Sequence, residues 1–151
     1  MRVSAKVDYA LRAAAELAAS PPGYVKAERL ATAQQIPLKF LENILTELRR
    51  AELVATQRGA EGGYRLARPA GEITLADVIR AVDGPLVSVY GLRPEAVEYD
   101  ESARVLQHVW IAARSSLRGV FEQVTIQDLA DGTLPPGVAA LTEDDDAWQP
   151  H

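Results

Sequence analysis

The sequence predicts a mainly α-helical protein with a small β-wing, in which a winged helix-turn-helix head precedes a long dimerisation helix. Three observations lead to this prediction. Residues 27–50 read as two helices joined by a short turn, residues 53–67 read as a glycine-tipped hairpin, and a long helical pattern with an apolar seam starts near residue 100. Helix, turn, helix and hairpin in this order describe a winged helix-turn-helix.

The first helix is predicted over Ser4 to Ala19. Ser4 can cap its N-terminus, and Asp8 lies near the positive end of the helix dipole. Many of its residues are alanines, which favours close packing against a neighbour. Pro21 and the Pro-Gly pair that follows end this helix.

The helix-turn-helix follows directly. A short helix is predicted over about Ala27 to Ala33, with a turn at residues 34–36. Pro37 opens the second helix, because a missing N–H costs nothing in a first helical turn. This helix reaches about Arg50, and its predicted buried stripe consists of Leu38, Leu41, Ile44, Leu45 and Leu48.

A β-hairpin comes next, with strands predicted at residues 53–56 and 64–67. Its tip contains three glycines, which permit the positive φ values of a tight turn. Thr74 can cap a further helix over about residues 75–82, with Asp77 in the capping-box position. Residues 85–99 are predicted to be irregular.

The longest helix is predicted from about Asp100 to Gln123. Its apolar residues follow a spacing close to a heptad, and they offer more apolar surface than a domain of this size covers. We therefore expect a second copy of the chain to cover the seam; an ordinary core helix is the alternative. The residues expected at the dimer contact are Leu106, Val109, Trp110, Ala113, Leu117, Val120 and Phe121.

The C-terminal segment completes the predicted domain organisation. Thr125 can cap a last short helix over residues 126–130, with Asp128 in the capping-box position. The prolines and the acidic run after it predict disorder. The division is a DNA-binding head at residues 1–84, a connecting loop at 85–99, a dimerisation helix with a short C-terminal helix at 100–132, and an acidic disordered tail at 133–151.

The charge is distributed unevenly along the chain. The net charge is −5, yet residues 1–68 hold eleven Lys and Arg against seven Asp and Glu, whereas residues 69–151 hold five against fourteen. Because DNA affinity depends on local positive charge, this pattern favours a DNA-binding head on a body that stays off the DNA. No apolar run suits a bilayer and no signal segment precedes the first helix, so we expect a cytoplasmic protein with no membrane partner.

Candidate DNA contacts lie on the polar face of the second helix and at the hairpin tip. An α-helix fits the major groove, and an arginine on a small loop can enter a narrow minor groove. Basic residues near helix starts can bind phosphates. The candidates are Arg2, Lys6, Lys26, Lys39, Phe40, Glu42, Asn43, Arg50, Arg58 and Gly59. The alternative is a winged-helix protein-interaction module without specific DNA binding.

The sequence resembles the Rrf-two family of bacterial transcription regulators over roughly residues 1–132. The resemblance rests on residues 6–10, 36–50, 58–68, 73–84 and 124–129, together with Trp110. It implies a transcription regulator, by default a repressor, that binds a near-palindromic operator in double-stranded DNA as a homodimer. By motif position it assigns DNA contacts to Lys39, Phe40, Glu42, Asn43, Arg58 and Gly59.

The same resemblance bears on cofactors. Iron–sulfur members of the family carry three cysteines before the long helix, and this chain has no cysteine, so we predict no cofactor and no metal site. No catalytic grouping or phosphate loop occurs, so an enzyme is not expected.

The sequence leaves three alternatives for the signal that controls the protein. These are a small-molecule effector near Tyr9, Tyr90, Trp110 and the segment at residues 85–99, a protein partner, or control by the abundance of the protein alone. We expect Arg93, in the connecting loop, to form a structural salt bridge, with an anionic ligand as the alternative.

Overall fold

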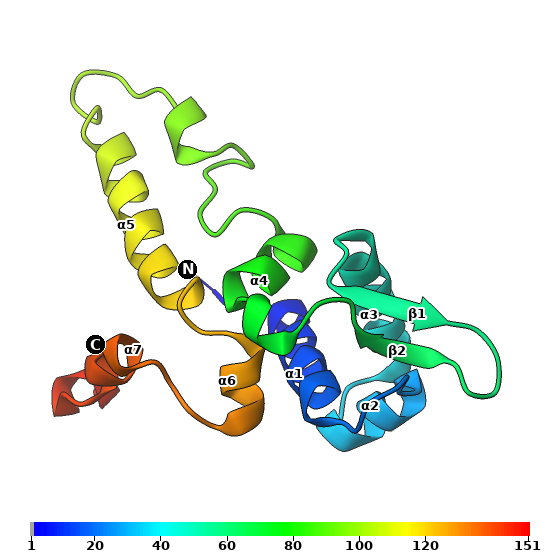
Figure 1. Ribbon diagram of the computed structural model, residues 1–151. Coiled ribbons are helices and arrows are strands. Elements are labelled where there is room, and N and C mark those ends of the chain that lie inside the picture. Colours follow the sequence, from blue (N-terminus) through cyan, green and yellow to red (C-terminus); the bar gives the residue numbers. More distant parts are fainter. Residues whose placement is uncertain (1) are drawn as a thin grey trace.

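The computed structural model describes residues 2–151 (Figure 1). The helices are α1 (Ala5–Ala19), α2 (Ala27–Gln34), α3 (Leu38–Arg50), α4 (Leu75–Asp83), α5 (Leu106–Phe121), α6 (Ile126–Asp131) and α7 (Pro136–Ala139). The strands β1 (Val54–Gln57) and β2 (Gly63–Leu66) pair antiparallel and form the wing. The predicted fold class is confirmed. No helix within residues 2–151 has the length and apolar character to cross a membrane.

Helix α1 lies at the centre of the head, where α2, α3, α4 and α6 pack around it. Its buried side includes Ala10, Ala13 and Ala14, whose short side chains let the neighbouring helices approach closely. The Ser4 hydroxyl accepts a hydrogen bond from the amide of Val7 at 3.1 Å and caps the helix, as predicted. The head therefore forms around one small-residue helix.

The wing is attached to the helix-turn-helix by a third extended segment. Val25, just before α2, exchanges two backbone hydrogen bonds of 2.8 Å with Tyr64 of β2. Within the hairpin, Val54 pairs with Leu66. Strand β1 begins at Val54, one residue later than predicted, and β2 begins at Gly63, one residue earlier than predicted.

Helix α6 packs onto the head, although the sequence division grouped it with the long helix. Capping boxes begin both α4 and α6 as predicted, through Thr74 with Asp77 and Thr125 with Asp128. The two caps lie side by side, because the caps' threonines form a β-bridge. Ile126 is fully buried in the core of the head. The chain thus returns to the head after α5.

Helix α5 is shorter than predicted and extends away from the head (Figure 1). It begins at Leu106, whereas residues 101–105 form turns, so the predicted start at Asp100 is wrong. The apolar seam starts only at Leu106, and a helical turn without an apolar face to bury gains little from tertiary packing. None of the 16 residues of α5 is buried.

The C-terminal segment is partly helical, contrary to the prediction of a disordered tail at residues 133–151. Short turns at Ala140–Thr142 and Asp145–Trp148 follow α7. Val138 is buried, and the Trp148 indole donates a hydrogen bond to the carbonyl of Thr142 at 2.8 Å. Pro135 and Pro136 lie at the start of α7, where proline is tolerated. A short helix therefore forms in a segment whose composition predicts disorder.

Candidate nucleic-acid interface

Helix α3 has one apolar side in the core and one polar side in solvent. Leu41, Ile44, Leu45 and Leu48 are buried as predicted. Leu38 differs, because this first residue of the helix is 36% exposed. The predicted contact residues on the outer side are all exposed: Lys39, Phe40, Glu42, Asn43 and Arg50. The helix therefore offers a cation, an amide, a carboxylate and an aromatic edge within its first two turns.

The ring of Phe40 is oriented by packing against α1. It is 46% exposed, and it meets the Tyr9 ring edge to face with 5.8 Å between the ring centroids. The Arg12 guanidinium lies 5.4 Å from the centroid of the same Tyr9 ring. Phe40 is therefore held at the start of α3 while half of its surface stays open to a ligand.

The wing tip places Arg58 and Gly59 in solvent. Gly59 has a φ of 102°, which a residue with a side chain adopts only with strain. The amide of Gly62 donates a hydrogen bond to the carbonyl of Gly59 at 3.1 Å and closes the tip. A Cβ atom on Gly62 would lie 2.1 Å from the carbonyl oxygen of Gln57, so only glycine fits there.

We expect Gly62→Ala to open the wing tip. The added methyl group meets backbone atoms that cannot move separately, and overpacking of this kind costs about 1–3 kcal/mol. The melting temperature followed by circular dichroism should fall, and DNA affinity should fall with it. Gly71→Ala is the matched control, because nothing lies within 4 Å of its new Cβ. Equal melting temperatures for the two variants would contradict the expected clash.

Two predicted phosphate contacts have partners inside the protein. The Lys6 ammonium lies 2.8 Å from the carboxylate of Glu47 and joins α1 to α3. The Lys26 ammonium donates a hydrogen bond of 2.7 Å to the carbonyl of Gly59 and joins the start of α2 to the wing tip. Each ammonium keeps N–H donors beyond this one partner, so the predicted phosphate contacts would use those remaining donors. Arg2 is exposed before α1.

None of the predicted dimer residues on α5 is buried within residues 2–151, but only Val109 is exposed and the other six are partly covered. The connecting segment packs along the edge of this seam, where the Gln107 amide donates to the carbonyl of Val97 at 2.8 Å. The Trp110 indole donates to the Tyr99 hydroxyl at 2.9 Å. Val109, in the seam, is 50% exposed. The seam residues are all half-buried or exposed: Leu106, Val109, Trp110, Ala113, Leu117, Val120 and Phe121.

Comparisons with known proteins give the class of this protein. A candidate helix-turn-helix-type transcriptional regulator of Mycobacterium tuberculosis (strain H37Rv) is 49% identical over 145 residues, which cover 95% of this chain and 90% of that protein. The helix-turn-helix-type transcriptional regulator CymR of Bacillus subtilis (strain 168) is 34% identical over 134 residues, covering 88% of this chain and 92% of CymR. The fold and these relatives define a DNA-binding winged-helix transcription regulator; the relatives are regulators rather than enzymes.

Solved structures and a family match narrow this class. The structure of CymR, described as the global cysteine regulator of B. subtilis, has a TM-score of 0.73 at 33% identity and covers 88% of this chain and 98% of that chain. T. potens IscR has a TM-score of 0.69 at 28% identity, covering 99% and 97%. The family described as Rrf2, iron-dependent transcriptional regulator, matches residues 3–132. The chain belongs to the Rrf2 family, which confirms the predicted resemblance.

The residues of this chain do not fit an iron–sulfur cluster, although the family description names iron. Cluster iron is held by cysteine thiolates, and the sequence has none. The segment before α5 offers oxygen donors instead, and one of them, Glu95, is bound to Arg114 at 2.5 Å. Within residues 2–151 no three His, Asp or Glu side chains come together as a metal site. These residues therefore provide no basis for regulation of this protein by an iron–sulfur cluster.

Proposed function

We propose that the protein is a sequence-specific repressor that binds a near-palindromic operator as a homodimer in the cytoplasm. One observation supports this most strongly: the polar side of α3 and the wing tip are both exposed at the end of the head away from α5 (Figure 1). A helix and a hairpin tip placed together in this way suit adjacent major and minor grooves. The acidic remainder of the chain lies away from the proposed DNA side.

The contacts follow from the chemistry of each side chain. Lys39 suits a phosphate or guanine, Asn43 suits adenine, and Glu42 accepts a hydrogen bond from cytosine. Phe40 suits a thymine methyl group, and the Arg58 guanidinium suits the negative potential of the minor groove. Phosphate contacts are assigned to Arg2, Lys6, Lys26 and Arg50, and the backbone at Gly59 lets the wing approach closely.

The dimer is proposed from α5. No residue of α5 is fully buried and Val109 in its apolar seam is 50% exposed, so the seam keeps apolar surface that a second copy of the chain would cover. Two heads related by a two-fold axis then meet two half-sites about one helical turn apart. Such a dimer represses by occupying the operator, which needs no contact with polymerase. The signal that controls it, a small-molecule effector or a protein partner, belongs to the same proposal.

We expect Asn43→Ala to relax base preference at one position in each half-site. An asparagine amide that pairs with adenine contributes about 1–3 kcal/mol of discrimination, and alanine keeps the helix while removing both hydrogen bonds. Selection of bound sequences from a randomised DNA library measures this. Gln127→Ala, exposed on α6, is the control and should leave the selected sequence unchanged. An unaltered preference in the Asn43 variant would remove this residue from the interface.

A gel shift at increasing salt tests the proposal as a whole. Specific binding to a genomic operator should survive an excess of competitor DNA, and the logarithm of the affinity should fall steeply with the logarithm of the salt concentration. A protein-interaction module of the same fold would bind no genomic fragment under these conditions. That result would replace the repressor proposal by the alternative.

A further inference from the structure

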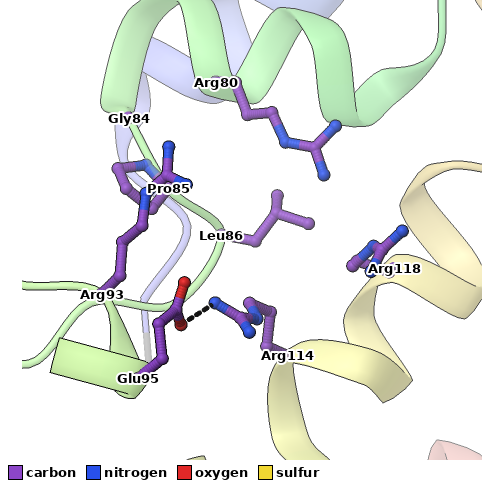
Figure 2. A pocket seen from close by; sticks show the side chains of 8 residues that line it. All are labelled: Arg80, Gly84, Pro85, Leu86, Arg93, Glu95, Arg114 and Arg118. Carbon is purple, nitrogen blue, oxygen red and sulfur yellow. Dashed lines mark hydrogen bonds and ion pairs between the residues drawn. The ribbon is translucent and has the colours of Figure 1, made fainter. Parts of the chain in front are cut away.

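A cavity of about 430 Å³ lies between α4, the connecting segment at residues 85–99 and α5 (Figure 2). Arginines reach it from all three sides. Arg80 comes from α4, Arg93 from the connecting segment, and Arg114 with Arg118 from α5. The rest of the lining consists of Gly84, Pro85, Leu86 and Glu95. The cavity is therefore mostly cationic, with a short apolar stretch.

Positive charge is concentrated at this cavity, whereas the C-terminal half of the chain as a whole is acidic. Residues 69–151 contain only five basic side chains against fourteen carboxylates, and four of these five arginines line this one cavity. The fifth, Arg104, lines a different hollow near Tyr99. Like charges repel unless counter-charges meet them, so the balance of charge inside the cavity decides what the site can do.

Two carboxylates partly neutralise the four arginines. Glu95 accepts a hydrogen bond from Arg114 at 2.5 Å, and Glu122 binds both Arg80, at 2.5 Å, and Arg118, at 3.0 Å. Four positive and two negative groups leave an excess of two positive charges.

Both carboxylates stay ionised at neutral pH, so this count of charges holds. Hydrogen bonds from Arg118 and then Arg80 lower the pKa of the Glu122 carboxyl. A hydrogen bond from its own backbone amide, followed by that of Arg114, lowers the pKa of the Glu95 carboxyl.

Arg93 is the arginine of this cavity that forms no hydrogen bond or ion pair with a carboxylate, although its charge also helps to lower the pKa of the Glu95 carboxyl. The sequence predicts a structural salt bridge for it, but within residues 2–151 its guanidinium forms no ion pair, so that prediction is wrong. In Figure 2 its side chain and that of Arg118 lie on opposite sides of the cavity. A planar guanidinium has five N–H donors arranged for bidentate contact with an oxyanion. Arg93 therefore offers a complete donor set to a ligand.

We propose that this cavity binds a small molecule that carries two oxyanion groups. Arg93 and Arg114 lie around Glu95 at one end, while Arg80 and Arg118 share Glu122 at the other, so each end holds one excess positive charge. Phosphate, sulfate and carboxylate groups all suit such arginine pairs. A volume of this size takes a compact metabolite. The site is separate from the proposed DNA contacts, and the proposal does not depend on them.

Isothermal titration of the full-length protein tests this proposal directly. The probes are pyrophosphate and succinate, which present two phosphoryl or two carboxylate groups, and sodium chloride at equal ionic strength is the control. We expect at least one probe to bind with one site per chain. Orthophosphate and acetate, which present a single group, should bind more weakly. The relative affinity of pyrophosphate and succinate then assigns the site to phosphate-bearing or carboxylate-bearing ligands.

Three variants localise the binding. Arg93→Ala should weaken it about tenfold or more, because a bidentate charged contact is lost. Arg104→Ala removes the same charge outside the cavity and should change it little. Glu122→Gln removes a competing carboxylate and should strengthen binding several-fold, a direction that misfolding cannot produce. Light scattering monitors the oligomeric state of each variant.

Several results would overturn the proposal. These are no heat beyond the chloride control with either probe, equal losses in the Arg93 and Arg104 variants, or weaker binding in the Glu122 variant. A change of oligomeric state in Arg93→Ala would also overturn it, because the arginines would then serve the contact between subunits.

Discussion

Leu117→Asp is expected to convert the protein into monomers and to abolish operator binding. Leu117 lies in the apolar seam of α5, and a carboxylate buried there against a second subunit would cost several kcal/mol for each copy. A monomer reads one half-site and loses the effective concentration that links the two heads, so affinity for the whole operator should fall at least a hundredfold. Light scattering measures the mass, and a gel shift with the whole operator measures the affinity.

Ser115→Asp is the matched control for this change. It adds the same charge two residues earlier, at an exposed position about 160° around the helix from Leu117, on the face opposite the seam. This variant should remain a dimer with unchanged DNA affinity. If Leu117→Asp keeps the dimer mass while circular dichroism shows intact helices, the seam is not the contact between subunits.

The second large effect is expected from Arg58→Ala at the wing tip. Loss of the guanidinium should lower operator affinity about tenfold or more, which corresponds to about 1.4 kcal/mol or more. It should also reduce the slope of log affinity against log salt by about one, because one fewer ionic contact releases counterions. The side chain is exposed, so the melting temperature should hardly change.

Arg93→Ala serves as the control, since it removes the same charge from the cavity beside α5. Its DNA affinity in the absence of small anions should stay close to that of the unchanged protein. Equal losses of affinity in the two variants would mean that overall charge, rather than the position of Arg58, governs DNA binding.

The elements that the sequence predicts well are those whose signals are local. Thr74 with Asp77 and Thr125 with Asp128 carry their own capping boxes, and the structure contains both. Proline and glycine mark the ends of α1 and the wing tip within a few residues. The polar side of α3 follows from helical periodicity, because its buried leucines and its exposed residues alternate with the helix repeat.

The features that the sequence does not predict depend on contacts between distant segments. Nothing local indicates that Lys6 meets Glu47 or that Lys26 meets the wing carbonyl of Gly59. Helical spacing alone places Arg114 and Arg118 on one side of α5, but their meeting with Arg80 requires the chain to turn back through the connecting segment. The exposure of Leu38 and the start of α5 differ from the prediction because an apolar pattern does not fix the residue at which burial begins.

The hydrogen bond between the Lys26 ammonium and the Gly59 carbonyl has a consequence for how the protein meets DNA. It holds the wing tip against the start of α2 before any ligand arrives. A head whose wing is already held in place loses little conformational freedom when it binds DNA, so more of the contact energy remains as affinity. In the proposed complex such a head would also tolerate a misfitting groove poorly, which would favour the operator over other DNA.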